Sequence, residues 1–140
     1  MRTAVLIALG LIVAAVICVA SDRLERRRRL GRLRRSLGSR PNVSDEQFAT
    51  AMPQVQSPEV LEMRALLATF LGVDAQKIAP EWRFREERDL KGMEGFIYHA
   101  FAIRYAPEQM RNGKPFKFPA SEVVTVRELF LEASRLRNGN

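Results

Sequence analysis

The sequence predicts an all-α protein in which an N-terminal transmembrane helix precedes one small helical domain. Three observations predict this class. Residues 3–21 contain no charged side chain, and residues 22–40 are dense in arginine. The hundred residues that follow show apolar residues at helical spacing, separated by helix-capping signals. We therefore divide the chain into an anchor (1–21), a basic juxtamembrane segment (22–40) and a helical domain (41–140).

The predicted membrane span is the uncharged stretch TAVLIALGLIVAAVICVAS. As a helix it would extend roughly 28 Å, close to the thickness of a bilayer's hydrocarbon core. A cleaved signal peptide is the alternative, because Cys18-Val19-Ala20 faintly resembles a cleavage site. The sequence RLERRRRLGRLRR, directly downstream, favours the membrane helix, since secretion would carry those arginines across the bilayer.

The distribution of charge predicts the orientation of this helix. The whole chain has a formal charge of +7, and residues 22–40 alone hold nine arginines against Asp22 and Glu25. Residues 41–140 are nearly neutral, with thirteen basic and fourteen acidic side chains. Because positive charge stays on the cytoplasmic side, we expect the N-terminus outside and the domain in the cytoplasm. A stripe of small residues, Gly10, Ala14 and Cys18, predicts a possible homodimer of the membrane helices.

The basic segment has the pattern of an amphipathic helix lying on anionic lipid headgroups. Leu30, Leu33 and Leu37 share one helical face, and arginines occupy the others. An RNA or an acidic protein is the alternative partner. No aromatic residue is interleaved for base stacking, which disfavours nucleic acid. The arginines predicted to contact the membrane surface are Arg26, Arg27, Arg28, Arg29, Arg32, Arg34 and Arg35.

Capping signals divide the domain into helices. Ser44 and Gln47 have the spacing of a capping box at the start of a short helix. Ser57 as N-cap, followed by Pro58 at the first helical position, predicts a longer helix that ends at Gly72. Its apolar stripe is expected to comprise Val60, Leu61, Arg64, Leu67 and Leu71.

The second half of the domain contains a loop and two further predicted helices. In the loop, Ile78, Trp82 and Phe84 are expected to reach the core. The last helix is expected to be capped by Thr125 and to turn Leu129 and Phe130 inward. The helix between them has a predicted apolar face of Met93, Phe96, Ile97, Ala100, Phe101 and Ile103.

Three stretches of this domain, in order, resemble the acyl carrier protein family. They are LLATFLGVDAQKIAPEWRF, DLKGMEGFIYHAFAIRY and FKFPASEVVTVRELFLEA, within residues 57–134. The resemblance implies a small four-helix acyl-carrier-like bundle. Family members attach phosphopantetheine to a serine in an Asp-Ser-Leu triplet, which corresponds here to Lys91, Gly92 and Met93. Glycine has no hydroxyl to esterify, so we expect a degenerate carrier module without a cofactor.

The sequence offers little for catalysis, and we expect no enzyme activity. His99, with Glu94 or Tyr98 nearby, is the one faint acid–base candidate, and a lone histidine on a helical bundle is more often structural. Glu86, Glu87 and Asp89 are more typical of a solvated charged surface than of a metal site. We therefore expect no metal.

These observations predict a non-catalytic interaction or scaffold module, anchored in a membrane and bound to an unknown protein. The predicted contact surface comprises Trp82, Glu86, Glu87, Asp89, Met93 and Tyr98. Two alternatives stay open. One is a membrane-bound acyl carrier or lipid-synthesis component, and the other is a membrane-tethered RNA-binding protein that uses its arginine-rich segment.

Overall fold

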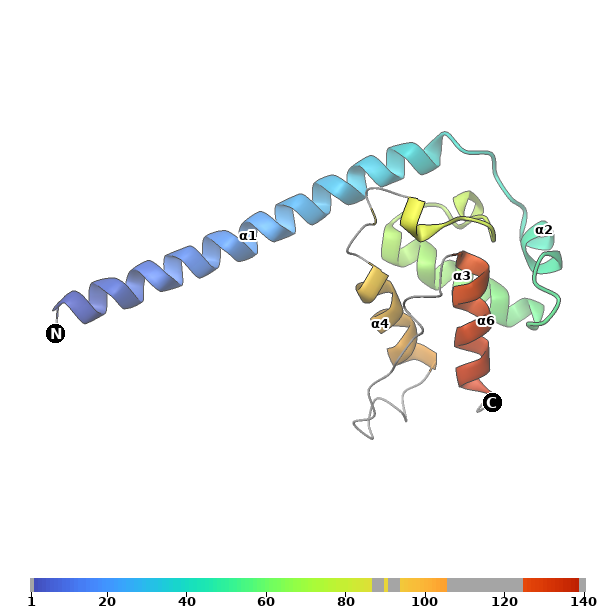
Figure 1. The fold of residues 1–140 in the computed structure, drawn as a ribbon. Helices are drawn as coiled ribbons and strands as arrows, with labels where there is room; N and C mark the ends of the chain where they lie inside the picture. Colours follow the sequence, from blue (N-terminus) through green and yellow to red (C-terminus); the bar gives the residue numbers. More distant parts are fainter. Residues whose placement is uncertain (1, 87–89, 91–93, 106–124, 139–140) are drawn as a thin grey trace.

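The computed structural model describes residues 2–86, 90, 94–105 and 125–138, without the side chains of residues 2–12 and 85. In this part of the chain the structure is helical, as predicted, and contains no strand beyond an isolated bridge between Arg83 and Thr125. A long helix projects from a compact group of shorter helices (Figure 1). The helices are α1 (Arg2–Gly38), α2 (Asp45–Thr50), α3 (Ser57–Leu71), α4 (Glu94–Tyr105) and α6 (Val126–Arg137), with 3₁₀ turns at Ala75–Lys77 and Phe84–Glu86.

Helix α1 continues without a break from the apolar N-terminal stretch through the basic segment. Among the described residues, which exclude the side chains of the first twelve, no helix is both long and apolar enough to cross a membrane. The predicted span of residues 3–21 therefore lies partly outside the description and stays a prediction. Of the predicted dimer stripe, Gly10 lies in the part of α1 for which only the backbone is described, and Cys18 is exposed.

The C-terminal end of α1 packs against the domain. Leu33 and Leu37 are completely buried and belong to the same hydrophobic core as α3, α4 and α6. We expected these leucines to face lipid. They face protein instead because α3 and the following loop cover them, so the hydrophobic core begins within the basic segment.

Polar contacts join the end of α1 to the C-terminal end of α3. The Arg34 Nε donates to the Leu71 carbonyl oxygen at 3.2 Å, and the Lys77 Nζ donates to the Arg40 carbonyl at 2.7 Å. Gly72 ends α3 in the left-handed conformation (φ 66°), as predicted for a glycine cap. A side chain at Gly72 would also collide with the Arg34 guanidinium. Arg34 thus places a cation at the negative end of the α3 dipole.

The predicted helix caps are present, with one shift. Ser44 forms a full capping box with Gln47, and Thr125 forms another with Glu128. Helix α3 begins one residue earlier than predicted, with Gln56 as its N-cap and no side-chain cap bond. Ser57 is already helical because Pro58, in the first turn, fixes the helical entry without a side-chain cap.

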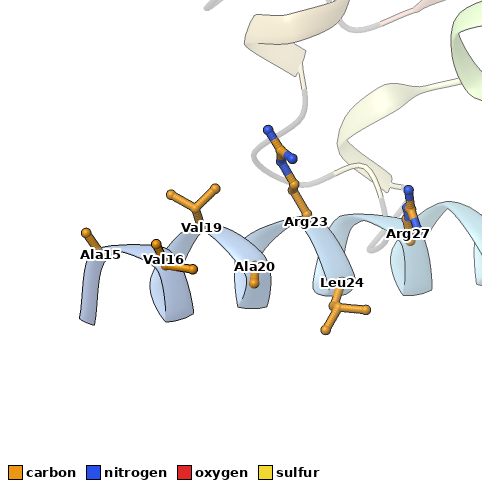
Figure 2. A pocket seen from close by; sticks show the side chains of 7 residues that line it. All are labelled: Ala15, Val16, Val19, Ala20, Arg23, Leu24 and Arg27. Carbon is orange, nitrogen blue, oxygen red and sulfur yellow. The ribbon is translucent and has the colours of Figure 1, made fainter. Parts of the chain in front are cut away.

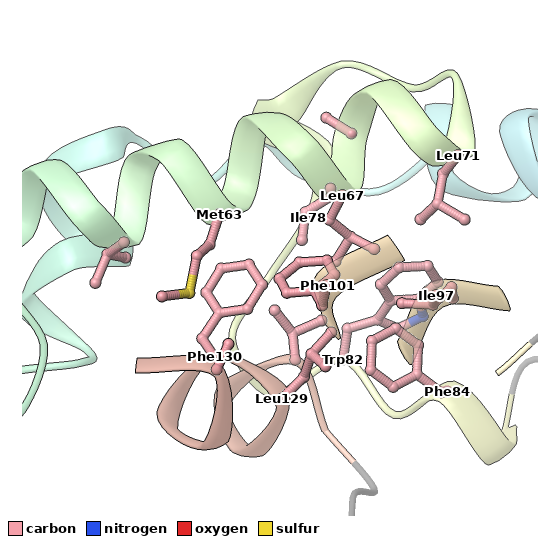
Figure 3. Packing of buried hydrophobic residues seen from close by; sticks show 14 of the residues in the cluster. Met63, Leu67, Leu71, Ile78, Trp82, Phe84, Ile97, Phe101, Leu129 and Phe130 are labelled. Atoms are coloured by element: carbon pink, nitrogen blue, oxygen red, sulfur yellow. The ribbon is translucent and has the colours of Figure 1, made fainter. Parts of the chain in front are cut away.

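Aromatic rings fill the centre of the core between α3, α4 and α6 (Figure 3). Phe130 of α6 lies 5.7 Å from Phe101 of α4 and 5.8 Å from Phe48 of α2, measured between ring centroids. Leu129 and Phe130 point inward, as predicted. Ile78, Trp82 and Phe84 are buried as predicted, so the loop between α3 and α4 forms one wall of the core.

The face that helix α4 presents to the core agrees with the prediction only in part: Ile97 and Phe101 are buried as predicted. Its buried residues follow rows spaced by four positions, while Phe96 and Ile103 are exposed at 45% and 56%. Apolar residues occupy nearly every side of this helix, so periodicity alone did not select the buried one. Met93 lies outside the described residues. The buried residues of α4 are Ile97, Tyr98, Phe101, Ala102 and Tyr105.

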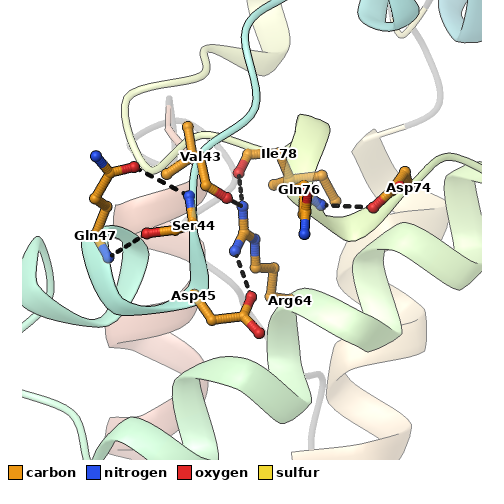
Figure 4. A network of polar contacts seen from close by, with 8 residues as sticks. All are labelled: Val43, Ser44, Asp45, Gln47, Arg64, Asp74, Gln76 and Ile78. Atoms are coloured by element: carbon orange, nitrogen blue, oxygen red, sulfur yellow. Dashed lines mark hydrogen bonds and ion pairs between the residues drawn. The ribbon is translucent and has the colours of Figure 1, made fainter.

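A fully buried arginine fastens the connection between α1 and α2 to α3 (Figure 4). Arg64 Nη1 pairs with Asp45 at 2.8 Å, and Nη2 donates to the carbonyls of Val43 (2.7 Å) and Ile78 (3.0 Å). Its guanidinium also lies 4.3 Å from the Phe48 ring centroid. Burial lowers the pKa of Arg64, and the Asp45 carboxylate opposes that shift. The network is structural because its partners are the chain's own carbonyls and a capping-turn carboxylate.

Candidate functional site

The arginines of α1 divide into those held by the protein and those directed to solvent. Arg26 pairs with Asp22 at 3.7 Å, and Arg29 pairs with Glu25, each one turn away on the exposed helix. Arg34 is held against α3. The exposed members of the predicted lipid-contact set are Arg27, Arg28, Arg32, Arg34 and Arg35. Exposed i,i+4 ion pairs are weak, so these two pairs hold Arg26 and Arg29 only loosely.

A hollow of about 500 Å³ runs along α1 where its apolar stretch meets the arginines (Figure 2). Val16, Val19 and Leu24 supply its apolar walls, and Arg23 and Arg27 supply cations at the C-terminal end. In the view of Figure 2, Val19, Arg23 and Arg27 project toward the domain, while Leu24 projects away. The hollow is open, and in it an apolar stretch of α1 lies directly beside two guanidinium groups.

Helix α4 meets α1 at the level of these arginines. The Arg26 guanidinium carbon lies 4.1 Å from the centroid of the Phe96 ring, over its face. This geometry is a cation–π contact between two partly exposed side chains. It brings an exposed aromatic residue of the domain next to the basic part of α1.

The predicted protein-contact surface around Trp82 and Tyr98 is wrong for these two residues. Trp82 is 5% exposed and packs 5.6 Å from Phe84, and Tyr98 is 6% exposed. Both rings serve the core because the loop and α4 turn them inward, so neither is available to a partner. Glu86 is exposed and pairs with Arg83 at 2.9 Å. The other predicted members, Glu87, Asp89 and Met93, lie outside the described residues.

The residues considered for catalysis, cofactor attachment and metal binding are only partly described. His99 is exposed and Tyr98 is buried, so the two side chains do not form a shared site. Gly92, at the position of the carrier serine, lies outside the described residues. In the described ranges no group of three potential metal ligands comes together.

The opposite end of the domain carries a polar cleft of about 430 Å³ between the start of α3 and the end of α6. Glu62, on its wall, pairs with Arg104 at 2.7 Å and with Arg137 at 3.6 Å. The Arg104 hydrogen bond lowers the pKa of Glu62 below its ordinary value. Beside it, burial and the Glu62 charge raise the pKa of Tyr105 to about 12. Glu62 is thus paired within the protein and joins α3, α4 and α6, whereas Oε1 of Glu59, also on the cleft, is buried without a hydrogen-bond partner among the described residues.

Sequence reasoning missed three features of this arrangement. Arg64 was placed on the apolar stripe of α3 without a role, and a charged residue on a buried face was the available signal. Arg34 was assigned to lipid, although it contacts α3. The contact between Arg26 and Phe96 had no signal in the sequence, because seventy residues separate the two.

Comparisons of this chain with protein-family models, curated proteins and solved structures found no match. The resemblance to acyl carrier proteins therefore remains a prediction.

Proposed function

We propose that this protein is a single-pass membrane protein that holds a non-catalytic helical interaction domain at the cytoplasmic face of the bilayer. The observation that carries the proposal is the course of α1. One helix contains nineteen uncharged residues, then the arginine cluster, then two leucines buried in the core of the domain. As a helix, the uncharged stretch is about as long as the hydrocarbon core of a bilayer is thick.

The arginines support both the orientation and the lipid contact in this proposal. Nine arginines directly after the span keep the domain on the cytoplasmic side. Each arginine near an anionic surface contributes on the order of 1 kcal/mol of attraction. The groove bounded by Val19, Arg23 and Arg27 offers a phospholipid both its apolar and its ionic contacts.

The domain itself is proposed to bind a protein partner rather than to act on a substrate. Its surface charges are balanced by ion pairs such as Glu62–Arg104 and Arg127–Glu81, which suits a stable, nearly neutral interaction surface. Because α1 is packed into the core, the domain is held in one orientation to the anchor. We assign the partner to the surface formed by α3 and α6, here called the α3–α6 side. In Figure 1 this surface is distant from the N-terminal half of α1.

Membrane extraction and topology mapping of the full chain test this function. We expect the protein to resist alkaline extraction and to float with liposomes, whereas Val13→Glu combined with Ile17→Glu should release it. In intact cells, a cysteine introduced at exposed Thr69, with Cys18→Ala, should be shielded from an impermeant thiol reagent. Release of the unaltered chain by alkali would reject the anchor, and labelling of Thr69→Cys would reject the orientation.

Cross-linking from the α3–α6 side tests the partner. A photo-reactive residue at Arg135, exposed on α6, should yield one discrete adduct in native membranes. The matched position is Arg27, exposed on α1 and six residues beyond the predicted span, which should yield lipid adducts. Adducts with many proteins, or none, at position 135 would argue against an interaction domain.

A further inference from the structure

We propose that the exposed face of α4, marked by Phe96 and Ile103, is a second membrane contact that rests on the headgroup layer of the bilayer spanned by α1. This inference rests on the proposed membrane anchor and adds the face of the domain that meets the lipid. The partner it names is an anionic phospholipid surface. Three observations support it: Phe96 and Ile103 are exposed, α4 contacts α1 close to the end of the predicted span, and arginines of α1 lie beside this contact.

Two large apolar side chains stand together on the outer face of α4. Phe96 and Ile103 are 45% and 56% exposed, and their spacing of seven residues puts them on one helical face. They lie about 10 Å apart along the helix axis, at 1.5 Å per residue. Outside α1, these two are the exposed large apolar side chains among the described residues.

The contact with α1 fixes the level of this face relative to the bilayer. Phe96 lies under the guanidinium of Arg26, five residues beyond the last residue of the predicted span. Five helical residues extend about 7.5 Å, which is within the headgroup layer of a bilayer. Phe96 is therefore held at headgroup depth whenever residues 3–21 span the hydrocarbon core.

The arrangement of the helices turns the same face toward the membrane. In Figure 1, α4 lies on the side of the domain nearer the N-terminal half of α1 and runs across α1 rather than along it. Helices α3 and α6 lie on its other side, where Ile97, Phe101 and Tyr105 are buried. The exposed row of α4 thus faces the plane in which the lipid headgroups would lie.

The surrounding chemistry favours lipid over a protein groove. The α1 side chain that contacts this face is Arg26 of the arginine cluster. Its neighbours along α1, Arg23 and Arg27, line the hollow that also contains Val19. Cations beside aromatic and aliphatic groups are the combination that interfacial helices use, with phosphates above and acyl chains below. A bilayer would satisfy all of these groups at once, and the contact would restrict rotation of the domain about α1.

Depth-dependent quenching in the full chain tests the inference. With Cys18→Ala as background, single cysteines are introduced by Phe96→Cys, by Ile103→Cys and, as the matched control, by Gln54→Cys. All three positions are exposed, so the substitutions leave the core intact. Each carries an environment-sensitive fluorophore, and the protein is reconstituted in vesicles of phosphatidylcholine with one-third phosphatidylglycerol.

We expect lipid-attached quenchers to quench the fluorophores at positions 96 and 103 several-fold more strongly than the fluorophore at position 54. Aqueous iodide should quench the fluorophore at position 54 more strongly than the other two. Flotation of the same samples reports the anchor separately. If the protein floats but all three labels behave as aqueous, the α4 contact is overturned and the anchor stands. If the protein does not float, the proposed function itself fails.

Discussion

Leu24 and Leu33 lie on the same helix, α1, and arginines surround both, yet their environments differ. Leu24 is 54% exposed, whereas Leu33 is completely buried in the core of the domain. The arginines follow the same division. Arg23 and Arg27 line an open groove, while Arg34 donates to the last carbonyl of α3. One basic amphipathic segment is therefore exposed at its N-terminal end and packed into the core of the domain at its C-terminal end.

This difference shows what an amphipathic pattern specifies. Spacing of leucines at three and four residues says that one helical face requires an apolar partner. It does not say whether the partner is lipid or protein, since both remove the same apolar surface from water. For Leu33 and Leu37 the domain provides that partner, which converts a flexible tether into a rigid connection.

The largest effect should come from the buried leucines. Leu33→Ala or Leu37→Ala should each lower the free energy of unfolding by about 2–5 kcal/mol, because each leaves a cavity in the core. Urea unfolding in detergent, followed by the fluorescence of buried Trp82, measures the change. Leu24→Ala is the control and should stay within about 0.5 kcal/mol of the unaltered protein. Equal effects at positions 24 and 33 would remove the distinction between the two regions.

A smaller effect should separate two neighbouring arginines. Arg34→Ala should destabilise the domain by about 1 kcal/mol, since it removes a charged donor from the carboxyl end of α3. Arg35→Ala, next to it and exposed, should leave the urea midpoint nearly unchanged. If both variants unfold at the same urea concentration, Arg34 has no role beyond surface charge.

Two glycines should respond in opposite directions. A Cβ at Gly31 would meet no neighbouring atom, so Gly31→Ala should stabilise α1 by about 0.5–1 kcal/mol. Gly72→Ala should destabilise by a similar amount or more, because of the positive φ and the collision with Arg34. Thermal unfolding followed by circular dichroism distinguishes the two. Stabilisation by Gly72→Ala would contradict the left-handed conformation of Gly72.

The smallest effect at neutral pH is expected at the far end of the domain. The Tyr105 hydroxyl is buried without a hydrogen-bond partner among the described residues, so Tyr105→Phe should change stability little at pH 7. At alkaline pH, by contrast, we expect the Tyr105 hydroxyl to affect the stability of the fold. Because the folded pKa is raised from 10 to about 12, the fold retains the proton longer than the unfolded chain does. Stability should therefore fall from pH 10 to pH 12.

The substitution Tyr105→Phe should remove much of this alkaline loss, because phenylalanine has no proton to release. Unfolding midpoints at a series of alkaline pH values provide the measurement. Tyr98→Phe is the matched control for tyrosine content. The same alkaline slope in Tyr105→Phe as in the unaltered protein would show that Tyr105 does not titrate with a raised pKa.

The sequence predicted where helices begin and end better than it predicted what each helical face packs against. Caps at Ser44, Gly72 and Thr125 were correct because they depend on neighbouring residues only. The buried face of α4 was predicted correctly for Ile97 and Phe101 but not for Phe96 and Ile103, because apolar residues surround this helix and packing against Phe130 selects among them. The contact of Arg26 with Phe96 depends on residues distant in the chain, for which spacing gives no signal. The position of Arg64 on a buried face was visible in the sequence, but its partners Val43, Asp45 and Ile78 were not.

The central claim is that α1 is both the membrane anchor and part of the core of the domain. Pulsed electron spin resonance measures it most directly, with spin labels at native Cys18 and at Thr69→Cys in lipid nanodiscs. A Gly31→Pro variant, which breaks the helix between anchor and core, supplies the flexible reference. We expect one narrow distance distribution for the unaltered helix and a broad one for the variant. A broad distribution in both would contradict the rigid connection.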